Sequence, residues 1–186
     1  MNYFDVLTRF LGFRITKYGP KPHIDFIKNK YKNKELIGAE IGVWMAENSV
    51  QIFKNLNIKK LYLIDPWGED LNYNEKDKLN KSKFAYNISM FRLNKYKNKF
   101  HVIRKTSDNA INDIKEKLDF VYIDGNHTYD YVKKDLENYW KLLKKGGVLA
   151  GHDVNFEGVF KAVYEFSIKI KQIPKILSYD YVFIKE

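Results

Sequence analysis

Short apolar runs alternate with longer amphipathic stretches along most of this 186-residue chain. The apolar runs, which we expect to be buried strands, span residues 36–43, 60–65, 100–104, 118–124 and 148–151. Amphipathic stretches, expected to be helices, span residues 48–56, 83–96, 107–117, 129–143 and 156–170. This alternation predicts an α/β fold, in which a doubly wound, mostly parallel sheet carries helices on both faces.

Two segments depart from this alternation. Residues 66–82 are rich in polar side chains and are interpreted as a loop insertion. Residues 172–176 and 179–184 are apolar and flank Leu177-Ser178, which predicts a C-terminal antiparallel hairpin. The hairpin adds two strands, so the sheet is expected to have seven.

The first 35 residues are expected to form an N-terminal helical arm, and residues 36–186 a single domain. The arm places Phe4, Leu7, Phe10, Leu11 and Phe13 at helical spacing, and Gly19-Pro20 and Pro22 mark its end. Such a helix packs on its own domain or rests on a membrane surface. No apolar run reaches the roughly 18–20 residues of a membrane span.

The chain carries a net charge of +10 and no cysteine. The charge could attract an anionic partner such as nucleic acid, but the lysines are scattered and form no basic block, which favours a compositional origin. The lack of cysteine excludes disulfides, thiolate metal sites and a cysteine nucleophile, and it fits a cytoplasmic location.

All but one of the predicted strands end at or beside a glycine, an acid or a histidine. Asp65 follows the second strand, Asp124-Gly125-Asn126-His127 follows the fourth, and Gly151-His152-Asp153 follows the fifth. Parallel sheets bind ligands at the carboxyl ends of their strands. The crossover helix between the last two clusters therefore brings both to one predicted cleft.

The loop after the first strand, Glu40 to Ser49, suits an anionic ligand, because Gly42 allows close approach and the helix beyond offers free N–H groups. An ordinary strand-to-helix turn is the alternative. The G-x-G-x-x-G dinucleotide fingerprint is absent, because Trp44 stands where that fingerprint has its second glycine. This weakens a nicotinamide or flavin interpretation. Asp65 could accept hydrogen bonds from ribose hydroxyls or be a solvated loop acid.

Taken together, Glu-x-Gly-x-x-x-Ala at residues 40–46, LYLIDPW at 61–67, the stretch from Leu118 to Asp153 and the terminal hairpin resemble the class I S-adenosylmethionine-dependent methyltransferases. The likeness is closest to small macrocin- and catechol-type O-methyltransferases and covers about residues 36–186. It implies a Rossmann-like fold, S-adenosylmethionine as cofactor, and a small-molecule or sugar hydroxyl as acceptor. Ala46 stands where that family usually has glycine.

The resemblance also implies roles for individual residues. Cofactor contacts fall on Glu40, Gly42, Val43, Trp44, Asn48, Ser49, Asp65, Ser107, Asp108, Asp124 and Gly125. Within this set Asp65 would hold the ribose, and Ser107 and Asp108 would lie beside the adenine. Catalytic roles fall on Asp124, His127 and His152.

A divalent metal, Mg²⁺ or Mn²⁺, is the second implied cofactor, held by Asp124, His152 and Asp153. Magnesium prefers oxygen ligands, whereas a histidine ligand suits manganese and related metals. His127 is favoured as the general base if His152 is a metal ligand, and the reverse assignment stays open. A structural cap is the alternative role for either histidine.

Two other functions remain open. A nucleic-acid methyltransferase is suggested by the charge, although the Asn/Asp-Pro-Pro-Tyr/Phe signature of amino-methylating DNA enzymes is absent. A non-catalytic module that only binds the cofactor is the other, and the intact Asp65, Asp124, His127 and Asp153 argue against it. The sequence also leaves open a homodimer and contact of the arm with a membrane.

Overall fold

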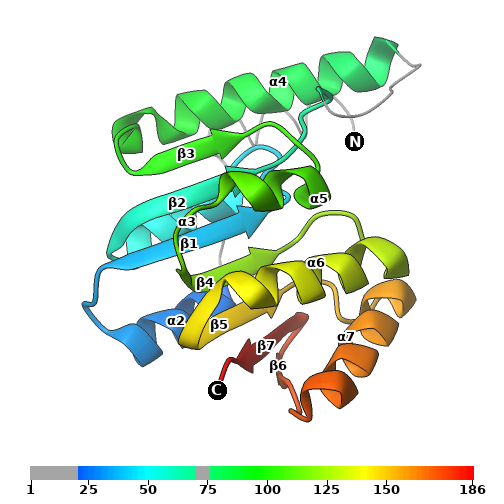
Figure 1. Cartoon of the computed structure of the whole chain (residues 1–186). Helices are drawn as coiled ribbons and strands as arrows, with labels where there is room; N and C mark the ends of the chain where they lie inside the picture. Colours follow the sequence, from blue (N-terminus) through cyan, green and yellow to red (C-terminus); the bar gives the residue numbers. More distant parts are fainter. Residues whose placement is uncertain (1–20, 70–75) are drawn as a thin grey trace.

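The computed structural model describes residues 21–69 and 76–186, in which helices and strands alternate (Figure 1). The helices are α2 (Pro22–Tyr31), α3 (Glu47–Asn55), α4 (Lys76–Leu93), α5 (Ser107–Ala110), α6 (Tyr129–Leu142) and α7 (Glu157–Ile170). The strands are β1 (Leu36–Ile41), β2 (Ile58–Ile64), β3 (Phe100–Ile103), β4 (Leu118–Ile123), β5 (Leu143–Gly151), β6 (Lys175–Leu177) and β7 (Asp180–Ile184). Short 3-10 turns, η1 (Asn94–Tyr96) and η2 (Ile111–Asp113), follow α4 and α5.

Within these residues seven strands form one sheet in the order β3-β2-β1-β4-β5-β7-β6. The first five pair in parallel, and β7 pairs antiparallel with β5 and with β6. The predicted doubly wound, mostly parallel sheet with a C-terminal antiparallel hairpin is therefore confirmed. The direction of strand order reverses between β1 and β4, which is where sheets of this kind form their ligand cleft.

Helices cover both faces of the sheet (Figure 1). One core contains Ile24 of α2, Ile52 of α3 and Ile88 of α4, and the other contains Leu136 of α6 and Val163 of α7. Every residue of β4 is buried, and every side chain except that of Asp119 belongs to one of the two cores. This explains why the LDFVYI stretch lacks the polar alternation of a half-exposed strand.

The N-terminal arm differs from its prediction where the structure describes it. Pro22 begins α2 instead of marking the end of the arm, because proline has no N–H to lose in the first turn of a helix. Ile24 and Ile27 are fully buried in the core of the domain. The helix predicted around Phe4 to Phe13, and its contact with a membrane, lie outside the described residues. The domain boundary at residue 36 stays a prediction.

Other elements also have different bounds from those predicted. Helix α4 begins at Lys76, inside the expected loop at 66–82, because its polar first turns lack an apolar period. Residues 107–117 hold the short α5 and η2 instead of one helix. Strand β5 starts at Leu143, and the hairpin turn falls one residue later than predicted, at 178–179. None of the helices in the described ranges has the length and apolar character needed to cross a bilayer.

A buried polar cluster joins β1 to α3. The Glu40 carboxylate is 1% exposed and accepts hydrogen bonds from Asn48 Nδ2 at 3.1 Å and from the Ser49 hydroxyl at 2.5 Å. Burial raises the pKa of Glu40 to about 7, although both hydrogen bonds favour the charged form. A carboxyl group of this kind is close to half-protonated at neutral pH.

Replacing Glu40 by Gln should therefore change the free energy of unfolding in a pH-dependent way. The folded-state pKa lies above the ordinary 4.5, so the stability that the protonated acid contributes is present at low pH and is lost as the pH rises through about 7. Relative to the parent, Glu40→Gln should be more stable at about pH 8 than at about pH 5, by up to about 3 kcal/mol. Urea unfolding measures this, with exposed Glu35→Gln as control. An effect equal at both pH values would contradict the prediction.

Gly42, directly after β1, lies against the backbone of Asp124 at the carboxyl edge of the sheet. Its φ is +83°, and a Cβ atom built on it would overlap the carbonyl group of Asp124. Gly146, in β5, has a similar φ of +76°, but a Cβ atom there meets no other atom within 4 Å. The two glycines thus share a backbone conformation and differ in the space around them.

This pair gives a matched test of the close approach at Gly42. Alanine at either position carries the cost of a left-handed conformation, about 1 kcal/mol, and only Gly42→Ala adds the overlap with the Asp124 backbone just after β4. We expect Gly42→Ala to lower the free energy of unfolding by about 1–3 kcal/mol more than Gly146→Ala. Chemical denaturation of both variants measures the difference. Equal losses would show that Gly42 is needed only for its φ.

Candidate functional site

A cleft of about 390 Å³ opens at the carboxyl ends of β1, β2, β3 and β4. The residues that matter for its chemistry are Gly42, Trp44, Asp65, Ser107, Asp124 and Asp135. They come from the loops after four parallel strands and from α6, and they meet because Ile41, Ile64, Ile103 and Ile123 end their strands in register. A cavity of this size suits a small organic cofactor.

Asp65 ties the loops after β1 and β2 together. One carboxylate oxygen accepts hydrogen bonds from the backbone N–H groups of Val43 at 3.1 Å and Trp44 at 2.9 Å, and the other accepts from Trp67 N–H at 2.8 Å. Burial raises the pKa of Asp65, and these three N–H groups oppose the rise. A carboxylate has about four acceptor positions, so one is left for a ligand hydroxyl.

The backbone of Trp44 is held from two further sides. Its carbonyl oxygen accepts hydrogen bonds from the Trp67 indole N–H at 2.8 Å and from the Ser89 hydroxyl at 2.5 Å. Trp44 and Ala46 both have left-handed backbones, with φ of 50° and 60°. Ala46 is the N-cap of α3 and has the left-handed conformation that a glycine adopts easily. The family that the sequence resembles usually has glycine at this position.

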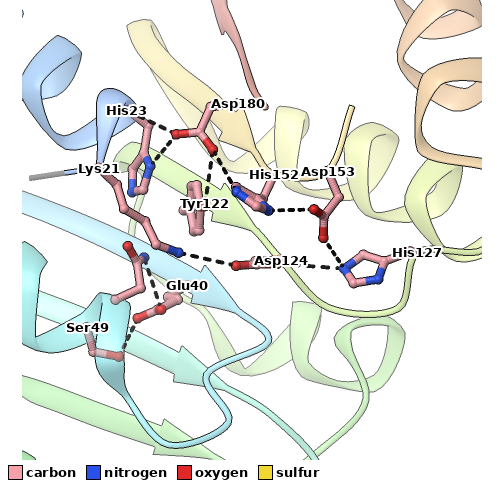
Figure 2. A network of polar contacts seen from close by, with 11 residues as sticks. Lys21, His23, Glu40, Ser49, Tyr122, Asp124, His127, His152, Asp153 and Asp180 are labelled. Carbon is pink, nitrogen blue, oxygen red and sulfur yellow. Dashed lines mark hydrogen bonds and ion pairs between the residues drawn. The ribbon is translucent and has the colours of Figure 1, made fainter. Parts of the chain in front are cut away.

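A row of acids and bases lies beside the cleft, along the ends of β4 and β5 (Figure 2). Its members here are Lys21, Asp124, His127, Asp153 and His152. Asp124 pairs with Lys21 Nζ at 3.6 Å and with His127 Nε2 at 3.7 Å. The same His127 nitrogen lies 3.1 Å from Asp153, whose other oxygen lies 2.8 Å from His152 Nδ1. Both sequence clusters therefore meet, as the βαβ crossover predicts.

The row continues into the protein interior through Asp180, the first residue of β7. Its Oδ1 atom lies 3.8 Å from His152 Nε2, and its Oδ2 atom accepts from His23 Nδ1 at 2.8 Å (Figure 2). His23 is fully buried and stacks on Tyr122 with ring centroids 3.7 Å apart. Burial lowers the pKa of His23, in spite of Asp180, so this imidazole is neutral at pH 7.

The charges of the row set the pKa values at its exposed end. Burial alone would raise the pKa of Asp124, but its contacts with His127 and Lys21 outweigh burial and lower it. The contact with Asp124 raises the pKa of His127, and the charge of Asp153 adds to the rise. His127 is 42% exposed, so it can meet a second substrate from solvent.

The predicted metal ligands lie close enough to share one ion. Asp124, His152 and Asp153 each offer one donor atom, and these three atoms lie within 4.8 Å of one another. Two carboxylate oxygens and one imidazole nitrogen suit manganese and related divalent metals better than magnesium. The donor set therefore fits a divalent cation, with the histidine favouring the softer metals.

The predicted cofactor residues divide into two groups. Gly42, Trp44, Asp65, Ser107, Asp124 and Gly125 line the cleft. The residues outside its lining are Glu40, Val43, Asn48, Ser49 and Asp108. Of these, Glu40, Asn48 and Ser49 form the buried cluster behind the loop, and Asp108 pairs with Lys134 at 3.3 Å. Their contacts with a cofactor stay a prediction.

Sequence reasoning missed Lys21, His23, Asp135 and Asp180. The first two belong to the arm, where no motif marks them. Asp135 and Asp180 do carry a signal, since each is an acid at a position that the local period assigns to the core. Asp135 stands three residues from buried Val132 on α6, and Asp180 opens the apolar strand β7.

Comparison with known proteins gives the family. The family described as a methyltransferase domain matches residues 39–154, more than half of the chain. An uncharacterized protein, R132, of Acanthamoeba polyphaga mimivirus is 28% identical over 164 residues, which are 78% of this chain and 69% of that protein. A protein of Sinorhizobium fredii is 30% identical over 81 residues, 43% of this chain and 9% of its own length.

Solved structures agree on the fold at low sequence identity. A Streptococcus mutans protein, described as a methyltransferase and solved with SAH, has a TM-score of 0.66 at 15% identity and covers 91% of this chain and 100% of its own. A Staphylococcus aureus protein, described as a caffeoyl-CoA O-methyltransferase, has a TM-score of 0.65 at 17% identity, covering 100% and 93%. An rRNA methylase of Streptococcus thermophilus has a TM-score of 0.61 at 15% identity, covering 86% and 90%.

The matched family segment begins in β1, includes the Asp65 loops and ends just beyond Asp153, so it contains the strand ends that form the cleft. The chain therefore belongs to the methyltransferase-domain family and is a methyltransferase with the class I, S-adenosylmethionine-dependent fold.

Proposed function

We propose that this enzyme transfers the methyl group of S-adenosylmethionine to a hydroxyl oxygen of a small molecule or saccharide, as macrocin- and catechol-type O-methyltransferases do. The observation that carries the proposal is the position of His127. It contacts Asp124, which lines the cofactor cleft, and Asp153, which lies at the end of the neighbouring strand. A base is thus held between the cleft and solvent, where an acceptor hydroxyl can reach it.

The reaction needs the acceptor oxygen to be aligned with the methyl carbon, and it needs one proton to be removed from the acceptor hydroxyl. The acceptor oxygen attacks the methyl carbon, the bond between that carbon and sulfur breaks, S-adenosylhomocysteine leaves, and the hydroxyl proton passes to the base. His127 suits this step better than His152, because both nitrogens of His152 face carboxylates, at 2.8 and 3.8 Å. His127 meets Asp124 and Asp153 through Nε2, so Nδ1 is the nitrogen that accepts the proton.

The cofactor would extend from Asp124 past Asp65 to Ser107. The free acceptor position on Asp65 suits a ribose hydroxyl, and Ser107 lies at the end of the cleft where the adenine would sit. The methionine sulfonium would then lie near Asp124, beside His127. Asp124, His152 and Asp153 would hold a divalent metal, Mn²⁺ or Mg²⁺. When bound, such a metal lowers the pKa of an acceptor hydroxyl.

Transfer of label from [methyl-³H]S-adenosylmethionine tests the acceptor class and the base together. Catechols, sugars and total RNA are offered as acceptors, and label should enter a small-molecule hydroxyl. With the best acceptor, His127→Ala should lower kcat by about 10²–10⁴-fold, because the proton loses its base. Calorimetric binding of S-adenosylhomocysteine should stay within about twofold, since alignment of the cofactor does not need the imidazole.

The matched control is His101→Ala, an exposed histidine on β3 away from the row. It should keep full activity. If label is found only in RNA, the enzyme is a nucleic-acid methyltransferase and the hydroxyl proposal is wrong. The net charge of +10 and the fold shared with an rRNA methylase would agree with that result. Unchanged kcat in His127→Ala would remove His127 as the base.

Manganese binding gives a separate test of the metal site. Asp153 has a φ of 60°, which asparagine tolerates better than alanine, so Asp153→Asn removes the charge and keeps the backbone. We expect this change to weaken Mn²⁺ binding, measured by titration calorimetry, by about tenfold or more. Asp25→Asn, an exposed acid on α2, is the control. Equal affinity in parent and Asp153→Asn would place any bound manganese elsewhere.

A further inference from the structure

Lys21 is a charged member of the row that the proposed chemistry does not use. Its Nζ atom lies 3.6 Å from Asp124 Oδ2 and 5.5 Å from the centroid of the Tyr122 ring (Figure 2). A lysine ammonium group carries a full positive charge, whereas a histidine carries one only when it is protonated. Lys21 therefore brings the strongest cation of the row, as far as the structure describes it, directly to Asp124.

The main chain of Lys21 is fixed by the helix that follows it. Its carbonyl oxygen accepts a hydrogen bond from Ile24 N–H at 2.8 Å, and Ile24 and Ile27 are fully buried in the core. His23 adds a second anchor, because its backbone N–H and its Nδ1 atom both contact the Asp180 carboxylate, at 3.2 and 2.8 Å. The Lys21 side chain is 37% exposed, so its ammonium group can leave Asp124 for water while α2 stays in place.

Asp124 is a ligand that two kinds of cation need. Both of its oxygens already face a basic group, since Oδ2 faces Lys21 and Oδ1 faces His127 at 3.7 Å. A divalent metal held together with His152 and Asp153 needs one of the same oxygens. The side chain of Asp124 is only 24% exposed, so water screens the repulsion between an ammonium group and a divalent ion poorly at this place. Simultaneous contact of both cations with Asp124 is therefore unfavourable.

We propose that Lys21 is the resident cation of this site, which holds Asp124 in the metal-free enzyme and competes with a divalent metal for that carboxylate. The inference rests on the metal site proposed for Asp124, His152 and Asp153, and it adds the residue that sets how tightly this site binds metal. A competitor that belongs to the same chain acts at a high effective concentration, so it keeps the metal affinity of the parent enzyme low. Lys21 leaves Asp124 when the ion binds, and a positive charge lies beside Asp124 in either state.

Titration calorimetry with Mn²⁺ alone tests the competition. Lys21→Met removes the charge and nearly keeps the length of the side chain, and it should bind Mn²⁺ at least about tenfold more tightly than the parent. Lys21→Arg keeps the charge, so its affinity should stay within about twofold of the parental value. Lys28→Met removes an exposed lysine from the same helix. It is the control for the change in net charge and should match the parent.

A double variant shows whether the tighter binding arises at the proposed metal ligands. Lys21→Met/Asp153→Asn should bind Mn²⁺ about tenfold or more weakly than Lys21→Met alone. A double variant that binds as tightly as Lys21→Met would place the ion elsewhere and overturn the inference. Mn²⁺ binding needs no acceptor, so these results are independent of which acceptor the label from S-adenosylmethionine enters.

The remaining outcomes also decide the matter. Equal or weaker Mn²⁺ binding in Lys21→Met would show that Lys21 does not compete with the ion, and the inference would be wrong. If Lys21→Met does not fold, Lys21→Gln takes its place with the same expected gain in affinity. If neither the parent nor the uncharged variant binds Mn²⁺, the metal site itself is refuted, and the competition with it.

Discussion

The cleft depends on one half-buried carboxylate that has no cation beside it in the contacts described. Asp65 is held by three backbone N–H groups from the loops after β1 and β2. Those bonds fix the path of the first loop, so Trp44 and Ala46 keep left-handed backbones without the flexibility of glycine. A loop of this kind is pre-organised for a ligand, because its conformation is determined by the sheet beneath it before anything binds.

The acid and base row has a second physical role. Although the chain is strongly basic overall, carboxylates of Asp124, Asp153 and Asp180 gather at the ends of β4, β5 and β7 (Figure 2). Lys21, His127 and His152 pair with these carboxylates, and the neutral imidazole of His23 hydrogen-bonds to Asp180. A site of this composition attracts cations and strengthens imidazole as a proton acceptor, and both properties suit methyl transfer to a hydroxyl.

The fold and the centre of the site could be predicted from the sequence because both follow from strand ends. Apolar runs fix the strands, parallel pairing aligns their carboxyl ends, and acids there must meet. The predictions failed where no period exists: the polar first turns of α4 resemble a loop, and α2 begins at a proline. Asp180 and His23 were missed because their partnership is long-range. Glu40, Asn48 and Ser49, for which cofactor contacts are predicted, are buried outside the lining of the cleft, and the sequence motif does not show which of its residues line a cleft.

The buried pair of His23 and Asp180 also bears on how the molecule assembles. Its two members are 157 residues apart in the chain, and β7, which starts at Asp180, is inserted between β5 and β6. Closing so long a loop has an entropic cost, so the contact depends on the sheet that brings its two members together. During synthesis the strand ends carrying Asp124 and Asp153 emerge well before Asp180. A growing chain can thus display its acids at the cleft while the interior support for His152 is still missing.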